Sequence, residues 1–329
     1  MIWTTWRQHR AEAAVGAVIL AALVAAMLTV GTIARSRARA GLEALHRDFH
    51  TIPPFTAALV AIPLLAGMFW AAPLVSREYE AGTHRLAWTQ SVSPLRWITT
   101  KIALIFGVLA LAALLLGLLA TWTLDPLVPA FGGRYNSSWY DIQGMVPVAC
   151  MLFALSVGVA ASALIRRTIP AMAVALLVYA VARIPVHWFR PHFAPVSTRT
   201  VTVPVSTLLL KLEGNPEDFA GSGASGDWVL HVRVTDSSGH PLDTHNGNLS
   251  VVQQYCPALS PTRAADGGVH VDADACRATI KALTIRDTVT YQPASHFWFI
   301  QAVESAIFFG LAVLFVTAAV LAVTRRRPS

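Results

Sequence analysis

A polar segment, Ser76–Lys101, lies between two long apolar stretches and carries the side chains most suggestive of chemistry. It holds two carboxylates, Glu78 and Glu80, close to basic side chains such as Arg77 and Arg85. Interspersed charges of both signs are typical of surfaces that recognise a complementary protein. The segment is longer than a simple return between two spans requires, so we interpret it as a contact surface. The alternative is a solvated loop with incidental charges.

No catalytic motif accompanies these charges. The sequence has no G-x-x-x-x-G-K-[ST] phosphate loop, no G-x-S-x-G turn and no H-E-x-x-H zinc motif. We therefore expect no enzymatic activity in this chain and expect any ATP hydrolysis to reside on a separate subunit. His270, Asp272 and Asp274 alternate as on one face of a strand, but metal-ligand spacing is missing. We predict a solvated strand face there and no metal site.

Composition indicates that these residues are positioned by membrane helices. Hydrophobic residues make up 55% of the chain and charged residues 13%, against roughly 25% charged residues in soluble domains. The net charge of +7 fits anchoring to anionic lipid headgroups rather than nucleic acid, because the basic residues gather at the ends of apolar stretches. Stretches long enough to cross a bilayer lie at 12–33, 54–75, 102–123, 144–164, 169–187 and 297–323.

The distribution of Lys and Arg predicts that both termini are cytoplasmic. Short segments on the side of the termini, including 76–101 and the basic tail 324–329, carry more Lys and Arg than the short loops opposite. The arginine-rich stretch after the first span is a local exception. We predict a multi-pass membrane protein.

Residues 1–11 combine aromatic and basic side chains ahead of the first span. Trp3 and Trp6 lie three residues apart, on one face of a helix, with Arg7 and Arg10 beside them. This pattern is typical of an amphipathic helix at the lipid–water interface, and an ordinary N-terminal flank is the alternative. Small residues in later spans, such as Gly107 and Gly158, allow close helix contact either in a dimer or within one subunit.

Residues 188–296 lack long apolar runs and predict a small external domain containing strands. Alternating or β-branched stretches favour strands at 201–205, 228–234, 249–255 and 283–291. Cys256 and Cys276 both fall here, and an oxidising compartment favours a disulfide between them, with two free thiols as the alternative. The predicted fold is therefore an all-α membrane protein of six spans (12–187 and 297–323) with a β-rich external domain between the fifth and sixth.

The Ser76–Lys101 segment resembles the region after the second span in permease subunits of ABC exporters of the type 2 class, particularly the actinobacterial ones. The matching positions are Arg77, Glu78, Glu80, Gly82, Thr83, Arg85, Leu86, Trp88, Thr89, Gln90, Trp97 and Lys101. The resemblance implies that the chain lies in the bacterial plasma membrane and that this segment couples to an ABC ATPase, which would bind ATP and Mg. It also implies that Glu78 and Glu80 face basic residues of that partner.

The start of the last span resembles the same family through YQPASHFWFIQAVE, with His296 where arginine is common. Phe297 and Trp298 suit the membrane interface, whereas Gln301 and Glu304 share a face deeper in the helix. A carboxylate at that depth is costly unless it is paired, and Arg183 on the fifth span has a matching depth. We predict an Arg183–Glu304 contact that braces an external gate; the alternative is that each side chain reaches the headgroups.

The resemblance implies a permease that works with a second copy of itself or a related permease and moves hydrophobic or amphipathic cargo by alternating access. Two other functions are considered. A secondary transporter predicts midplane ion sites and an inverted repeat, neither of which the sequence shows. A membrane sensor or assembly factor, with the external domain binding a ligand, is the alternative that the sequence leaves open.

Overall fold

The computed structural model describes residues 2–41, 55–82, 93–129, 133–204, 226–235, 262–263, 269–270 and 284–325. The helices are α1 (Ile2–Ala40), α3 (Phe55–Ala66), α4 (Pro73–Glu80), α6 (Pro94–Leu124), α7 (Val146–Ile165), α8 (Thr168–Phe189) and α12 (Phe297–Arg325), with a π-helical turn η1 (Gly67–Ala71) and 3-10 turns η2 (Asp125–Leu127), η3 (Tyr140–Ile142), η4 (Arg190–His192) and η7 (Ala294–His296). Within these ranges, six helices are long and apolar enough to cross a membrane. The six spans predicted from the sequence are confirmed.

The chain divides into two compact units. One, which we call the helical unit, comprises Met1–Val128, Asn136–Phe193 and Phe297–Ser329. The other, the sheet unit, comprises Pro129–Tyr135 and Ala194–His296. The predicted external domain began at 188; the sheet unit begins at Ala194, because α8 and η4 extend the fifth span to His192.

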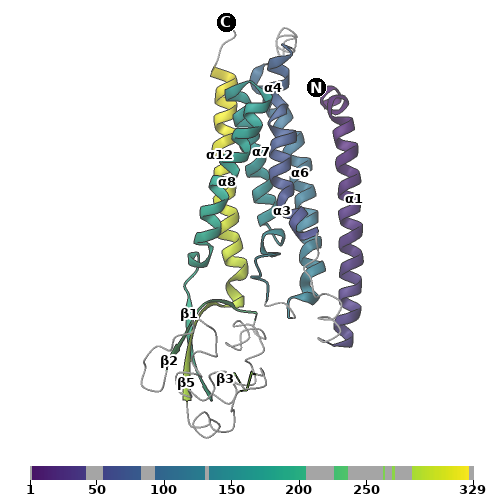
Figure 1. Cartoon of the computed structure of the whole chain (residues 1–329). Helices are drawn as coiled ribbons and strands as arrows, with labels where there is room; N and C mark the ends of the chain where they lie inside the picture. Colours follow the sequence, from purple (N-terminus) through teal and green to yellow (C-terminus); the bar gives the residue numbers. More distant parts are fainter. Residues whose placement is uncertain are drawn as a thin grey trace. The chain divides into compact units, whose positions relative to one another are not determined.

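Helix α7 is the centre of the helical unit. It packs against α12, α8, α6, α3 and η1, and Figure 1 shows it inside the bundle with α1 at the edge. The buried share of the most apolar window is 83% in α7 and 11% in α1, so α7 forms the protein core and most of α1 is exposed. Large buried side chains around α7 include Phe153, Leu155, Trp97 and Phe308.

Local sequence explains where these helices begin and end. Ser93 caps α6, its hydroxyl accepting a hydrogen bond from the Arg96 N–H at 3.3 Å. Helix α7 ends at Arg166, which adopts the left-handed conformation with φ 58°, and α8 follows at Thr168. The predicted N-terminal helix 1–11 is continuous with the first span in α1; its interfacial role, with Trp3 and Trp6, stays a prediction.

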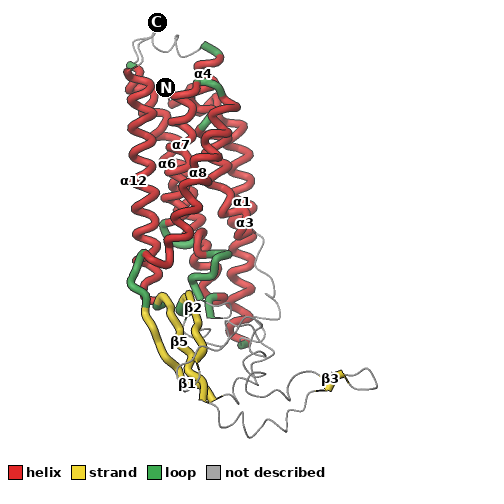
Figure 2. Tube along the Cα trace, turned by 60° about the vertical axis from the view of Figure 1, so that its left-hand side comes forward, coloured by secondary structure: helices red, strands yellow, loops and turns green. Residues whose placement is uncertain are grey.

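The sheet unit contains a three-stranded antiparallel sheet in the order β1 (Ser197–Pro204), β5 (Thr284–Gln292), β2 (Trp228–Thr235), drawn as yellow tube segments in Figure 2. A separate antiparallel pair is formed by β3 (Thr262–Arg263) and β4 (Val269–His270), each two residues long. The strands predicted at 201–205, 228–234 and 283–291 are confirmed. The strand predicted at 249–255 and both Cys256 and Cys276 lie outside the described residues.

Residues 129–135 belong to the sheet unit although they come from the loop after the third span. Tyr135 stacks on Trp228 with ring centroids 5.3 Å apart, and its hydroxyl donates to the Pro293 carbonyl at 3.1 Å. Gly133 approaches the Gly226 backbone so closely that a Cβ would meet Gly226 Cα at 2.8 Å. The small side chains here therefore allow two distant chain segments to pack backbone to backbone.

Candidate functional site

The end of α4 forms a polar junction with three other helices; we call Ser76, Glu78, Glu80, Lys101 and Thr168 the α4 junction. Glu78 makes an ion pair with Lys101 on α6, and the two side chains are 15% and 5% exposed. Glu80 receives the Thr168 backbone N–H at 2.9 Å and the Thr168 hydroxyl at 2.8 Å. A carboxylate at this position caps the N-terminus of α8 and is favoured by the helix dipole.

Serine and aromatic side chains reinforce this junction. The Ser76 N–H donates to Ser162 Oγ at 2.7 Å, and the Ser76 and Thr168 hydroxyl oxygens lie 2.9 Å apart. Arg166, in the turn between α7 and α8, lies over the Tyr79 ring at 4.8 Å. The end of α4 is therefore joined to α6, α7 and α8 by charged and hydrogen-bonded contacts.

The Glu78–Lys101 pair also joins the two ends of the polar segment Ser76–Lys101. Lys101 lies 4.6 Å from the centre of the Trp97 ring, and Trp97 is 1% exposed. Gly82 follows the C-cap of α4, and its φ of 70° favours glycine. Residues 83–92, including Thr83 and Arg85, lie outside the described residues.

The structure therefore gives Glu78 and Glu80 partners within this chain. The sequence predicted that both would face a partner protein, and that contact stays a prediction. Arg77, by contrast, lies on the exposed side of α4.

A second polar cluster lies at the opposite end of the helical unit, and we call Asp141, Arg183, Arg190 and Glu304 the charged ring. Arg183 contacts both carboxylates, with Asp141 at 2.6 Å. Arg190 does the same, with Asp141 at 2.5 Å and Glu304 at 2.9 and 3.0 Å. Two positive and two negative side chains thus alternate in a closed set of ion pairs.

Burial makes this ring energetically important. The Glu304 and Arg190 side chains are 0% and 3% exposed, so each charge depends on its partners rather than on water. Burial by itself would raise the pKa of Asp141, but Arg183 and Arg190 hold that pKa below its usual value of 3.8. The two arginines therefore favour the charged form of Asp141.

The sequence predicted the Arg183–Glu304 contact but missed the other two members. Asp141 lies in the connection between the third and fourth spans, where depth in the membrane gives no signal. Arg190 was assigned to the external domain, although it follows Arg183 by seven residues and so shares a helical face with it. A fifth span longer by one helical turn includes Arg190.

The segment before α7 is held against α12 beside the ring. Gln301 donates from Nε2 to the Tyr140 carbonyl at 3.2 Å, and Phe297 packs edge-on against the Tyr140 ring at 5.5 Å. Gly144 has φ 62°, and a Cβ there would meet the Trp298 ring at 2.9 Å. Of the two aromatics predicted at the interface at the start of the last span, Trp298 is 53% exposed, whereas Phe297 is 1% exposed and belongs to the core.

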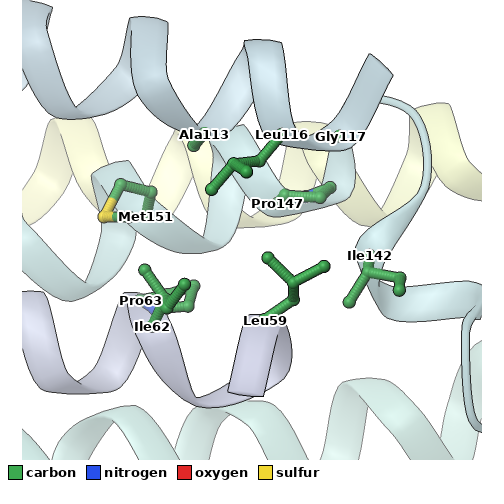
Figure 3. A pocket seen from close by; sticks show the side chains of 9 residues that line it. All are labelled: Leu59, Ile62, Pro63, Ala113, Leu116, Gly117, Ile142, Pro147 and Met151. Atoms are coloured by element: carbon green, nitrogen blue, oxygen red, sulfur yellow. The ribbon is translucent and has the colours of Figure 1, made fainter. Parts of the chain in front are cut away.

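A small apolar cavity of about 20 Å³ lies between α3, α6 and α7. Figure 3 shows Leu59, Ile62 and Pro63 of α3 facing side chains of α6 across it, with α7 alongside. The remaining lining residues are Ala113, Leu116, Gly117, Ile142, Pro147 and Met151. Its lining suits apolar groups. No group of His, Cys, Asp and Glu among the described residues could hold a metal ion.

Six apolar spans, with polar contacts at both ends of the helical unit, define a multi-pass membrane protein. Residues 9–190 match the family model described as "ABC-2 membrane transporter related", which covers more than half of the chain. The chain belongs to this family, whose members are components of membrane transport. No curated protein and no solved structure matches the chain. The matched range includes the α4 junction, Asp141, Arg183 and Arg190, but ends before the strands and α12.

Proposed function

We propose that the chain is the membrane permease subunit of an ATP-driven exporter and couples to a separate ABC ATPase through Ser76–Lys101. The family match over 9–190 is the observation that carries this proposal. Both termini and this segment would then face the cytoplasm, where the ATPase binds ATP and Mg. The path would form with a second permease chain, and the apolar lining between α3, α6 and α7 suits hydrophobic or amphipathic cargo.

The α4 junction supports coupling through this segment. Displacement of Ser76–Lys101 acts on the end of α4, and the junction ties that end to α6 through Lys101, to α7 through Ser162 and to α8 through Thr168. Buried ion pairs of this kind resist separation because each charge would be left without compensation. A movement imposed on the segment would thus reach three spans together.

The test is a pull-down of the tagged chain from native membranes, with ATPase activity measured in the eluate. Reversal of Arg77 and Arg85 to glutamate changes the charge of the segment and leaves Glu78, Glu80, Lys101 and Thr168 unsubstituted. We expect this variant to lose most of the associated ATPase activity.

The matched control exchanges the internal pair, Glu78→Lys with Lys101→Glu. This exchange keeps an ion pair at the base of the segment, so we expect more ATPase activity to be retained than with Glu78→Lys alone. Equal ATPase recovery with the wild type and with the Arg77/Arg85 variant would contradict coupling through this segment.

A further inference from the structure

The second span changes from α-helix to π-helix in its middle. Helix α3 ends at Ala66, a π-helical turn follows over Gly67–Ala71, and α4 begins at Pro73. The Ala72 N–H donates to the Gly67 carbonyl at 3.0 Å, the five-residue spacing of a π-turn. Pro63 and Pro73 flank the turn, and proline has no N–H for the carbonyl four residues earlier. The span thus lacks regular helical hydrogen bonds on both sides of η1.

The same turn packs closely against α7. A Cβ on Gly67 would meet the Ala154 carbonyl oxygen at 2.6 Å, and a Cβ on Gly158 would meet Ala71 Cβ at 2.7 Å. Gly158, predicted to allow close helix contact, does so within this subunit. Because Gly67 and Gly158 carry no side chains, the two backbones approach closely here, and this contact can act as a pivot.

The two halves of the span differ in how they are held. The end of α4 is fixed by the charged and hydrogen-bonded contacts of the α4 junction. In α3, Leu59, Ile62 and Pro63 instead line the apolar cavity opposite α6. Empty space beside α3 removes packing contacts that would otherwise hold it in one position.

We propose that η1 is a joint, so that α3 tilts about the contact with Gly158 while α4 stays with α6, α7 and α8. Tilting of α3 changes the size of the cavity that it lines. Prolines and π-turns are established causes of helix bending, and hinge motion needs only a few residues that absorb the change. A link from the ATPase through this joint to the cargo path rests on the proposed function. The existence of the joint does not depend on that function.

The test is a distance distribution between two spin labels on either side of η1, measured by pulsed electron resonance on the purified full chain in lipid nanodiscs. Val60 on α3 and Arg77 on α4 are exposed label sites, about 25 Å apart for a helical rise of 1.5 Å per residue. Phe299 and Thr317, both exposed on the unbroken helix α12, form the matched control pair. The native cysteines are replaced beforehand.

We expect the distribution across η1 to be about twice as broad as that on α12, because a bent helix samples several angles. Pro63→Ala with Pro73→Ala restores two helical N–H donors and should narrow it toward the control. Equal widths in the wild type, or a broad distribution that the alanine variant leaves unchanged, would overturn the joint. Because no ATPase is present, a failure of the proposed function leaves this result interpretable.

Discussion

Replacing Glu304 by glutamine removes the carboxylate that both arginines of the charged ring contact. In the wild type, this carboxylate accepts hydrogen bonds from Arg183 and, at 2.9 and 3.0 Å, from Arg190. The variant leaves two guanidiniums with Asp141 alone, and therefore one uncompensated positive charge in a site where Glu304 is 0% exposed. Breaking a buried ion pair in this way costs about 3–5 kcal/mol of the free energy of unfolding.

The loss should be partly reversed by removing one arginine as well. Glu304→Gln combined with Arg190→Gln leaves the Arg183–Asp141 pair, which is neutral overall, and we expect it to recover about 2 kcal/mol relative to additive losses. Thr317→Val is the control, since Thr317 is exposed on α12 and its hydroxyl donates to the Val313 carbonyl one turn earlier; it should change stability by less than about 0.5 kcal/mol.

The assay is unfolding of the purified chain in mixed micelles with increasing SDS, followed by circular dichroism. A loss for Glu304→Gln no larger than that of Thr317→Val would refute the assignment of the ring as a stabilising element. Additive losses in the double variant would refute the pairing itself.

Two further outcomes follow from the structure and one from the sequence. Gly144→Ala should cost about 1–3 kcal/mol in the same assay because of its left-handed backbone, whereas Gly107→Ala, which meets nothing within 4 Å, should not destabilise. The folded state holds the pKa of Asp141 below 3.8. The stabilisation that charged Asp141 contributes is therefore present above pH 3.8 and is lost as the pH falls through the lowered pKa. Asp141→Asn should remove this acid sensitivity, measured by unfolding at decreasing pH. Finally, we expect Cys256 and Cys276 to resist alkylation until reduction, as intact mass spectrometry would show, and the bridge to contribute roughly 3 kcal/mol; alkylation without reductant would contradict it.

The spans and three strands were predictable because each depends on a pattern within a short stretch of sequence. Runs of apolar residues fix the spans, and alternation fixes strands such as Trp228–Thr235. The Arg183–Glu304 contact was also within reach, because a membrane leaves a buried carboxylate few partners.

Contacts between distant segments were not predictable in the same way. Asp141 joins the charged ring through the path of a connection, and residues 129–135 join the sheet unit through packing against Trp228. Neither has a local sequence signal. The π-turn at Gly67–Ala71 lies between two prolines and packs closely against Gly158. A hydropathy pattern shows neither the prolines' effect on the helix nor this packing.

The central claim, that this chain is a permease driven by a separate ATPase, is tested most directly by purifying the tagged native chain from its own membranes and measuring ATP hydrolysis in the eluate. Membranes without the tagged chain provide the background. We predict hydrolysis well above that background, carried by a co-purified subunit with a phosphate-binding loop. An eluate that contains the intact chain but no ATPase subunit and no hydrolysis above background would contradict the claim.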